Sequence, residues 1–452
     1  MFRYQPISQE SDADFVARLC DRVEESLEKG LMPVEPFQDE RVFRAEMERI
    51  FTKSWVFVAH ESELKNAGDF VLRRIGLDQV IVTRTKDRAV HVLLNHCRHR
   101  GAPVCAEESG NSTRFRCPYH GWIYKNDGDF LGAPLASEAY GTKPDSKEWG
   151  LLKAPKIEIL HGLIFANLDQ NAPTLREYLG GAAWMLDAIF DIQKEGFDVL
   201  APPERFIIRA DWKSGAENFS GDSYHVQTAH YSATLSKFTP FDLRQNGDAA
   251  HGFLFDNGHS FIGHAFEGFA YWGLIPEIRE KLDLSRLDST QLRMLETDPP
   301  TIGTIFPNFS YLRFPTPSEP GRPNIPYTDI RLWQPLEPGV MEMWRWQLEF
   351  ACASDEYRKE SYEAAQFGFG SGGMIEIDDT ILWEGVAGYA RSPWARRDKA
   401  RLHYGQKRIE SDPGWCGPGK HYNTTYGEYM QDGFWRRWIA DIRNCKSAED
   451  GQ

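Results

Sequence analysis

The chain has 452 residues and a net charge of −14 at neutral pH, and 41% of its residues are hydrophobic. This length is sufficient for two or three domains with a substantial core, and the acidic balance argues against a general nucleic-acid-binding protein, which needs a basic surface. No apolar run approaches the roughly 18 residues that cross a bilayer, and the N-terminal segment lacks a basic region followed by an apolar one, so we expect a cytoplasmic protein with no membrane partner.

The N-terminal part of the chain has the pattern of an amphipathic helix. Within residues 36–55, apolar side chains recur with helical spacing at Phe43, Met47, Ile50 and Phe51. This spacing is typical of a helix that packs one face on other elements. We therefore expect residues 1–55 to form a helical segment that packs on the C-terminal domain.

The next part of the chain predicts a small antiparallel sheet. Residues 68–75, 78–85 and 89–96 alternate apolar and polar side chains, and turn-forming residues separate them. Such alternation indicates half-buried strands. A polar stretch rich in glycine follows residue 126 and leads to a new strand-like run near residue 161. The sequence thus predicts a second domain over residues 56–155.

Residues 156–452 mix both periodicities and predict an α+β domain. Helical patterns occupy residues 181–193 and 356–367, and strand-like runs occupy residues 204–210, 303–314 and 340–350. This mixture favours helices packed on an antiparallel sheet. The basic stretch 391–408 and the aromatic helix 433–442 are expected to be a solvated face and a packing helix, with a subunit contact as the functional alternative.

Two short segments of the second domain each place a cysteine beside a histidine. One contains Cys97 and His99, the other Cys117 and His120, with 17 residues between His99 and Cys117. Zinc accepts two cysteines and two histidines, but zinc fingers usually pair like with like on one local element. A mixed arm fits a Rieske [2Fe-2S] centre, in which one iron takes both thiolates and the other both imidazoles.

Glycines follow both arms, and one further cysteine lies nearby. Gly101 and Gly121 stand where the backbone must turn sharply and where backbone N–H groups can approach the sulfides. The seven cysteines do not suggest a secreted disulfide framework. We expect Cys105 to be a free core thiol without a role.

The segment ENFSGDSYHVQTAH, residues 217–230, carries a second constellation. On a helix, Asp222 and His225 are i, i+3 neighbours, whereas His225 and His230 would share a face only if the helix were bent or widened. Two histidines and one carboxylate form the facial triad that binds non-haem Fe(II) and leaves positions open for O2. The third ligand is expected at Asp378 or Asp379, after a glycine-rich bend.

Two competing patterns in this domain are weaker. Residues 368–373 match G-x-G-x-x-G, but they follow a helical pattern rather than a strand, so we interpret them as a hinge and not as a dinucleotide site. His251, His259 and His264 could also bind a metal, although their irregular spacing among glycines favours a loop.

These motifs resemble the catalytic α subunit of the Rieske non-haem iron aromatic ring-hydroxylating dioxygenases, over nearly the whole chain. The CRHRG and CPYHGW arms, the ENF-x-GD-x-YH-x4-H segment and the late DD pair occur in the order of that family. The resemblance implies four cluster ligands, namely Cys97, His99, Cys117 and His120. It implies the iron ligands His225, His230 and Asp379, because the second aspartate of the pair is usually the ligand.

The resemblance also implies the fold and the assembly. It predicts N-terminal helices, an all-β Rieske domain and a catalytic domain of helix-grip type over residues 156–452, in a ring of three α subunits, with three β subunits or without. Asp222 would bridge His120 of one subunit and His225 of its neighbour, and Asn218 would lie near the iron. The residues expected to line the substrate pocket are Phe219, Phe369, Met374 and Ile375.

The activity that the resemblance implies is dioxygenation of an aromatic hydrocarbon. Electrons from NADH would pass through a separate reductase and usually a ferredoxin to the cluster, and then across Asp222 to the iron. Both atoms of O2 would enter the ring to give a cis-dihydrodiol, in the degradation of aromatic or polycyclic aromatic hydrocarbons. A local basic excess could steer an acidic ferredoxin; it comprises Arg98, Arg100, Arg114, Arg116 and Lys125.

Three alternatives to this activity are open at this point. Within the same fold, the enzyme could be a Rieske monooxygenase or a dioxygenase of an aromatic acid such as benzoate, salicylate or phthalate. Outside it, a pure Rieske electron carrier would not need His225, His230 and Asp379. A zinc hydrolase would be colourless, whereas a Rieske oxygenase would be red-brown with about three irons per chain.

Overall fold

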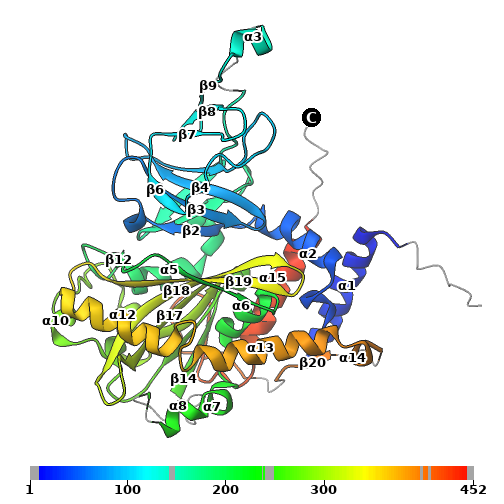
Figure 1. Ribbon diagram of the computed structural model, residues 1–452. Helices are drawn as coiled ribbons and strands as arrows, with labels where there is room; N and C mark the ends of the chain where they lie inside the picture. The colour runs from blue at the N-terminus through cyan, green and yellow to red at the C-terminus, as the bar shows by residue number, and fades with distance from the viewer. Residues whose placement is uncertain are drawn as a thin grey trace, which may run out of the picture.

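A computed structural model describes residues 10–141, 148–236, 238–239, 249–397, 401–405 and 409–444 (Figure 1). A small β domain lies above a larger domain in which helices cover a broad antiparallel sheet, and N-terminal helices pack beside both. The predicted α+β class is therefore confirmed. Within the described residues, no helix is long and apolar enough to cross a membrane.

The N-terminal helices pack against the last helix of the chain. Helix α1, Asp12–Leu27, begins at the cap residue Ser11, and α15, Tyr429–Arg443, lies beside it. Arg443 joins the two through ion pairs to Asp21 at 2.6 Å and Glu24 at 2.7 Å. The helix expected over residues 36–55 is divided. The turn η1 (Glu35–Phe37) is separate, and after the extended cap residue Asp39 the helix α2 (Glu40–Glu46) continues into a π-helical turn, η2 (Met47–Phe51).

The small domain contains the three strands that the sequence predicts. They are β3 (Asp69–Ile75), β4 (Asp78–Arg84) and β5 (Val90–Leu94), and β6 (Ser109–Asn111) completes a sheet in the order β5-β4-β3-β6. A second sheet stands above it, formed by β7 (Arg114–Arg116), β8 (Ile123–Lys125) and β9 (Phe130–Gly132). Helix α3, Ala136–Tyr140, lies at the tip.

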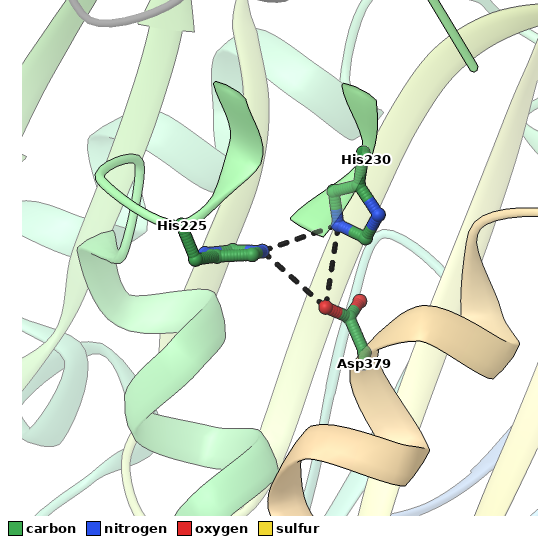
Figure 2. A group of neighbouring side chains, drawn as sticks. All are labelled: His225, His230 and Asp379. Atoms are coloured by element: carbon green, nitrogen blue, oxygen red, sulfur yellow. Dashed lines mark hydrogen bonds and ion pairs between the residues drawn. The ribbon is translucent and has the colours of Figure 1, made fainter. Parts of the chain in front are cut away.

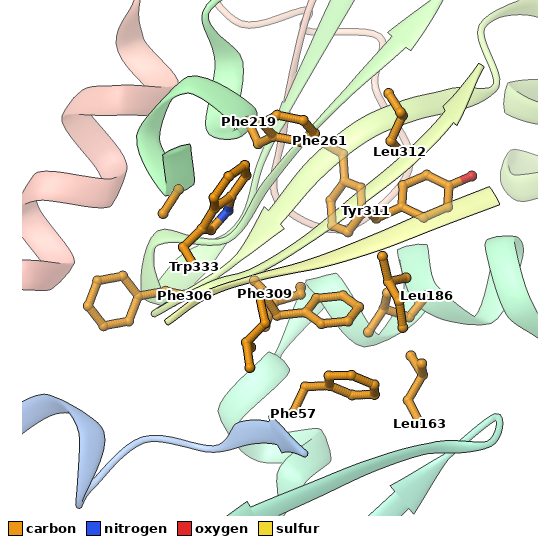
Figure 3. Close-up of a cluster of buried hydrophobic side chains, with 14 of the residues drawn as sticks. Phe57, Leu163, Leu186, Phe219, Phe261, Phe306, Phe309, Tyr311, Leu312 and Trp333 are labelled. Atoms are coloured by element: carbon orange, nitrogen blue, oxygen red, sulfur yellow. The ribbon is translucent and has the colours of Figure 1, made fainter. Parts of the chain in front are cut away.

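A third small sheet connects this domain to the rest of the chain. Strand β2, Val56–His60, pairs with β11, Leu163–Asn167, which pairs with β10, Lys156–Leu160. The side chain of Phe57 reaches the large domain, where its ring lies 5.3 Å from that of Phe309 and 5.2 Å from that of Trp346. Figure 3 shows Phe57 and Leu163 below the sheet residues Phe309 and Tyr311, so one apolar core spans both parts.

The large domain is built on a nine-stranded antiparallel sheet. Its order is β12-β19-β18-β17-β16-β15-β14-β21, and β13 also pairs with β19. The bounds are β12 Phe197–Val199, β13 Glu204–Ile208, β14 Ala250–Leu254, β15 Ser260–His264, β16 Pro300–Ile305, β17 Phe309–Pro317, β18 Asn324–Glu337, β19 Val340–Phe350 and β21 Lys420–Tyr422.

Helix α6, Trp212–Gly221, runs very close to this sheet. A Cβ at Gly215 would lie 2.4 Å from the ring of Trp333, so only glycine permits the approach. Thr304 on β16 also donates to the carbonyl oxygen of Ala216 at 2.9 Å. The other helices are α4 Leu175–Leu179, α5 Gly181–Phe190, α10 Pro276–Arg279, α11 Ser289–Thr297, α12 Asp355–Phe369, α13 Glu376–Arg391 and α14 Pro393–Arg397.

The short remaining elements complete the described part of the chain. Strand β1 (Leu31–Pro33) pairs with β20 (Arg401–His403), and the 3-10 turns are η3 (Glu61–Glu63), η5 (Asp256–Gly258) and η6 (Ala270–Gly273).

The expectation of a loop is wrong for His251 and His264, which lie on strands β14 and β15, whereas His259 lies in the connection between these strands. These residues belong to a hairpin in which β14 and β15 pair from Ala250↔His264 to Leu254↔Ser260. The glycines among them fit close packing rather than a loop, since a Cβ at Gly263 would lie 2.2 Å from the carbonyl oxygen of Asp298. Period-2 apolar side chains such as Phe253 and Phe261 are fully buried.

Candidate active site

The segment 217–230 is a broken helix, and the break sets the direction of its side chains. Helix α6 ends at Gly221, where a Cβ would lie 2.3 Å from Met430, and Asp222 leaves helical geometry with ψ of 73°. A separate short helix, α7 (Val226–Ala229), then runs between His225 and His230, and α8 (Tyr231–Leu235) follows. The two histidines therefore meet through a break between helices rather than through one bent or widened helix, and α15 packs beside the break.

The break brings both histidines to Asp379, which lies in the first turn of α13. The Nε2 atoms of His225 and His230 lie 3.2 Å apart, and each lies 3.3 Å from Oδ1 of Asp379 (Figure 2). Two ligand atoms held about 2.1 Å from one metal ion are about 3.0 to 3.4 Å apart. The three atoms therefore have the spacing of ligands around one ion.

The charges around this point favour a cation. A carboxylate faces the Nδ1 atom of each imidazole: Asp222 lies 3.3 Å from that of His225, and Asp378 accepts from that of His230 at 3.4 Å. With an ion bound, protons on Nδ1 would leave the Nε2 lone pairs directed at that ion, whereas without one the protonated Nε2 atoms face Asp379. Burial raises the pKa of Asp379, but His230 and His225 outweigh it and hold this pKa well below its usual range. Two imidazoles and one carboxylate fit Fe(II).

Asp222 lies on the outer side of His225. Its Oδ1 accepts from the backbone N–H of His225 at 3.4 Å, and its Oδ2 accepts from the amide of Asn218 at 3.4 Å. The side chain of Asp222 is 28% exposed, whereas that of Asp379 is 5% exposed. Asp222 can therefore contact both His225 and a group outside this chain.

An apolar cavity opens beside the three residues. Of the four side chains predicted to line it, Phe219, Phe369 and Ile375 do so, whereas Met374 packs against the main core instead. The sequence reading missed two lining residues within the motif segment, Ser223 and Val226. It also missed residues of strands β15 to β17, which have no sequence link to the motif, namely Ile262, His264, Ile302, Leu312 and Phe314.

The two cysteine–histidine arms form loops with the same backbone geometry. The N–H of Cys97 donates to Ala102 and that of Cys117 donates to Trp122, both at 2.8 Å. Gly101 and Gly121 have φ of 75° and 70°, a region that favours glycine. Their own N–H groups donate to the carbonyls of Cys97 and Cys117, so the two glycines close the turns.

The side chains of the arms converge as two pairs rather than around one ion. Cys97 and Cys117 are buried, and the rings of His99 and His120 lie 4.4 Å apart. Among the described residues, the groups whose ligand atoms all lie within 4.8 Å of one another do not include these four, which argues against a single zinc ion. The Nδ1 atom of His99 is buried without a hydrogen-bond partner, as expected of a metal ligand.

Two aromatic residues that the sequence reading missed surround the arms. The hydroxyl of Tyr124 lies 3.1 Å from Sγ of Cys97 and accepts from the N–H of Arg98 at 3.0 Å. The ring of Trp122 stacks on His99 with centroids 5.0 Å apart. Both follow the second arm in the sequence, and their contacts with Cys97, Arg98 and His99 link it to the first.

Cys105 is a buried free thiol, as predicted. Its Sγ lies 3.5 Å from the carbonyl oxygen of Glu107, and Asn95 fixes its backbone. Among the described cysteines, none forms a disulfide.

Comparisons with known proteins match the two domains in which these sites lie. Residues 54–149 match the Rieske [2Fe-2S] domain, and residues 175–407 match the ring-hydroxylating alpha subunit catalytic domain. The chain is 52% identical over 98% of both chains to the N,N-dimethyl phenylurea N-demethylase subunit alpha of Sphingobium sp. (strain YBL2). It is 31% identical to the large oxygenase component of the naphthalene 1,2-dioxygenase system of Ralstonia sp., covering 91% of this chain and 92% of that one.

A solved structure extends the agreement to the fold. Naphthalene 1,2-dioxygenase from Rhodococcus sp. bound to indole superposes with a TM-score of 0.90 at 33% identity, covering 97% of this chain and 100% of that one. This fold carries a Rieske [2Fe-2S] cluster and a mononuclear non-haem iron. The chain therefore belongs to the ring-hydroxylating α-subunit family of the Rieske non-haem iron oxygenases.

Proposed function

We propose that this protein oxidises a neutral aromatic molecule bound in the cavity beside His225, His230 and Asp379. The observation that carries the proposal is the wall of the cavity. It is mainly aliphatic and aromatic, and no lysine or arginine lines it among the described residues. A bound iron there would supply the activation of O2, with electrons delivered through the cluster. The chain's own task is to hold the ligands and to position an apolar ring.

The state of His264 argues against an aromatic acid as substrate. This residue lines the cavity, and its Nδ1 lies 2.6 Å from the hydroxyl of Thr301. Burial lowers the pKa of His264 to about 3, so the imidazole is uncharged at neutral pH. A carboxylate substrate would find no cationic partner among the described residues of this wall.

The reaction that we infer is oxidative N-demethylation of an N-methylated aryl compound such as an aryl urea. The relative that is 52% identical over 98% of both chains has this activity by name. One oxygen atom would enter the N–CH3 group and the other would leave as water, with consumption of two electrons and two protons. The hydroxymethyl product then breaks its C–N bond and releases formaldehyde.

The second candidate is cis-dihydroxylation of an aromatic ring. The likeness to naphthalene 1,2-dioxygenases and the apolar wall favour it. It would consume the same two electrons and two protons, but both oxygen atoms would stay on adjacent ring carbons.

Product analysis under ¹⁸O2 separates the two candidates. The purified chain, with NADH and electron-transfer proteins of this enzyme class, would be given N,N-dimethyl phenylurea and naphthalene in parallel. N-demethylation predicts the monomethyl urea and formaldehyde, measured by mass spectrometry. A dihydrodiol with two labelled oxygens, without formaldehyde, would support dihydroxylation and contradict the first candidate.

We further propose that Asp222 joins His225 to His120 of the partner subunit, in a ring of three α subunits with or without β subunits. In one chain, strands β7 and β8, which enclose the second cluster arm, lie at the opposite end of the molecule from α7 (Figure 1). Exposed apolar side chains surround both ends and would be covered by such contacts. They are Tyr119, Leu131 and Leu135 at the tip, and Tyr224, Ile381 and Leu382 near His225.

Electron delivery from NADH through a reductase and a ferredoxin belongs to the same proposal. The five cationic side chains predicted to steer an acidic ferredoxin are all exposed. Of the acids nearby in the sequence, Glu108 is paired with Arg205, and Asp129 lies 3.9 Å from Lys125. We also propose the domain boundaries that the sequence predicts, with a helical segment over residues 1–55, a Rieske domain over residues 56–155 and a catalytic domain over residues 156–452.

Tyr124→Phe is expected to lower the reduction potential of the cluster. The hydroxyl contacts Cys97 Sγ, and a hydrogen bond to sulfur stabilises the more negative, reduced state. One such bond contributes about 1 kcal/mol, which corresponds to roughly 40 mV for one electron. Spectroelectrochemical titration measures this shift. An unchanged potential with an unchanged visible spectrum would show that the hydroxyl does not donate to the sulfur.

A further inference from the structure

A second group of two imidazoles and one carboxylate lies away from the active site. His251 is on β14, His421 is on β21, and Asp298 follows α11. The ligand atoms of all three lie within 4.8 Å of one another. His264 lines the active cavity and pairs with Ala250, so the next residue, His251, points to the opposite face of the sheet.

The three side chains are held in place by their surroundings. Thr297 donates to Oδ1 of Asp298 at 2.5 Å, which leaves Oδ2 directed at the imidazoles. This Oδ2 lies 2.9 Å from Nδ1 of His251 and 3.5 Å from Nε2 of His421. The ring of Trp415 stacks on His421 at 4.9 Å and fixes its plane. The shorter Oδ2 separation is a hydrogen bond between His251 and Asp298 in the structure, and both Oδ2 separations lie within about 0.1 Å of the roughly 3.0 to 3.4 Å expected between ligands of one ion.

One ring nitrogen of His421, Nε2, is placed to bind a cation. Its Nδ1 donates to Oδ2 of Asp412 at 3.3 Å, so in the neutral ring Nε2 presents a lone pair. This Nε2 is buried and has no hydrogen-bond partner, although it faces the carboxylate oxygen of Asp298. Two facing acceptors in a buried place are unfavourable unless a cation lies between them.

We infer that His251, Asp298 and His421 form a second metal site that binds a divalent transition ion, with Zn²⁺ as its occupant. Two imidazoles and one carboxylate are an established zinc ligand set, and the site leaves a fourth position for water. The side chain of His251 is 22% exposed, against 7% for His421, so the ion can enter past His251. Asp412 acts as the outer carboxylate that orients His421. The ion would tie the edge strand β21 and the segment after α11 to β14.

The test uses the full chain with Asp379→Ala, which takes the carboxylate out of the active-site triad and so weakens any binding of added zinc there. After treatment with a chelator that leaves the visible spectrum of the cluster intact, Zn²⁺ binding is measured by equilibrium dialysis. We expect about one Zn²⁺ per chain. The same chain with His421→Gln should bind none, and Asp412→Asn should raise the dissociation constant by roughly 10- to 100-fold.

His251→Gln in the Asp379→Ala chain keeps the test decisive if His421→Gln impairs folding, because His251 is the more exposed ligand. It should also abolish zinc binding, while the cluster spectrum and the thermal unfolding transition of the zinc-free chain stay unchanged. The inference is overturned if the Asp379→Ala chain binds no zinc, or if zinc is retained after His251→Gln. In the first case His421 is a doubly protonated partner of Asp298, and in the second the bound zinc is adventitious.

Discussion

Asp379→Ala is expected to reduce the iron content from about three to about two per chain and to abolish turnover, while the visible spectrum of the cluster is unchanged. The carboxylate of Asp379 lies 3.3 Å from both Nε2 atoms and is the one anionic group at their meeting point. Its loss leaves two neutral imidazoles on separate turns. We expect a fall in turnover well beyond the 10- to 100-fold that loss of an outer carboxylate costs.

Asp378→Ala is the matched control for this variant. It removes the neighbouring carboxylate, which contacts Nδ1 of His230 and not the ligand atoms. Iron affinity should fall by about 10- to 100-fold, so that iron can be restored by adding Fe(II). Iron and acid-labile sulfide analysis together with the visible spectrum measure both variants. If Asp379→Ala kept the third iron and Asp378→Ala lost it, the ligand would be Asp378.

The cluster arms could be predicted from the sequence because each is a local motif. Cys97 and His99, and likewise Cys117 and His120, stand within one turn whose glycine has positive φ. The neighbouring strands were also predictable, since alternating side chains report a half-buried sheet directly. What the sequence did not reveal is the contact between the arms, such as Tyr124 on Cys97.

The catalytic site was predictable as a set of residues but not as a geometry. Met430, more than 200 positions later in the chain, packs against Gly221 at the end of α6 and leaves no room for a side chain there. The hairpin β14–β15 was missed because its glycines allow the approach of Asp298, a contact with no local signal. Residues of β15 to β17 form the cavity wall because the order of strands in the sheet brings them beside the cavity. Their spacing along the sequence does not reveal this position.

Asp222→Asn is expected to keep both metals and to slow turnover by roughly 10- to 100-fold. The carboxylate faces Nδ1 of His225 at 3.3 Å and is partly exposed, which suits a bridge to His120 of the partner subunit. A carboxylate can accept a hydrogen bond from each imidazole with a negatively charged oxygen, whereas the amide of asparagine is neutral and has one acceptor oxygen. The substitution should therefore disturb both the imidazole tautomers and the coupling between the cluster and the iron. The direct measurement is the rate at which the pre-reduced cluster is reoxidised by O2 in the presence of substrate, followed by stopped flow.

Asp378→Asn separates bridging from simple orientation of a ligand. Asp378 stands on Nδ1 of His230 at 3.4 Å, nearly the same geometry as Asp222 on His225. If both carboxylates only fix the tautomer of a ligand, the two variants should slow reoxidation equally once iron is saturated. If Asp222 joins two subunits, only Asp222→Asn should slow it, with normal iron content. Reoxidation at the wild-type rate in Asp222→Asn would exclude the bridge, and loss of iron from it would instead make Asp222 a support of the iron site alone.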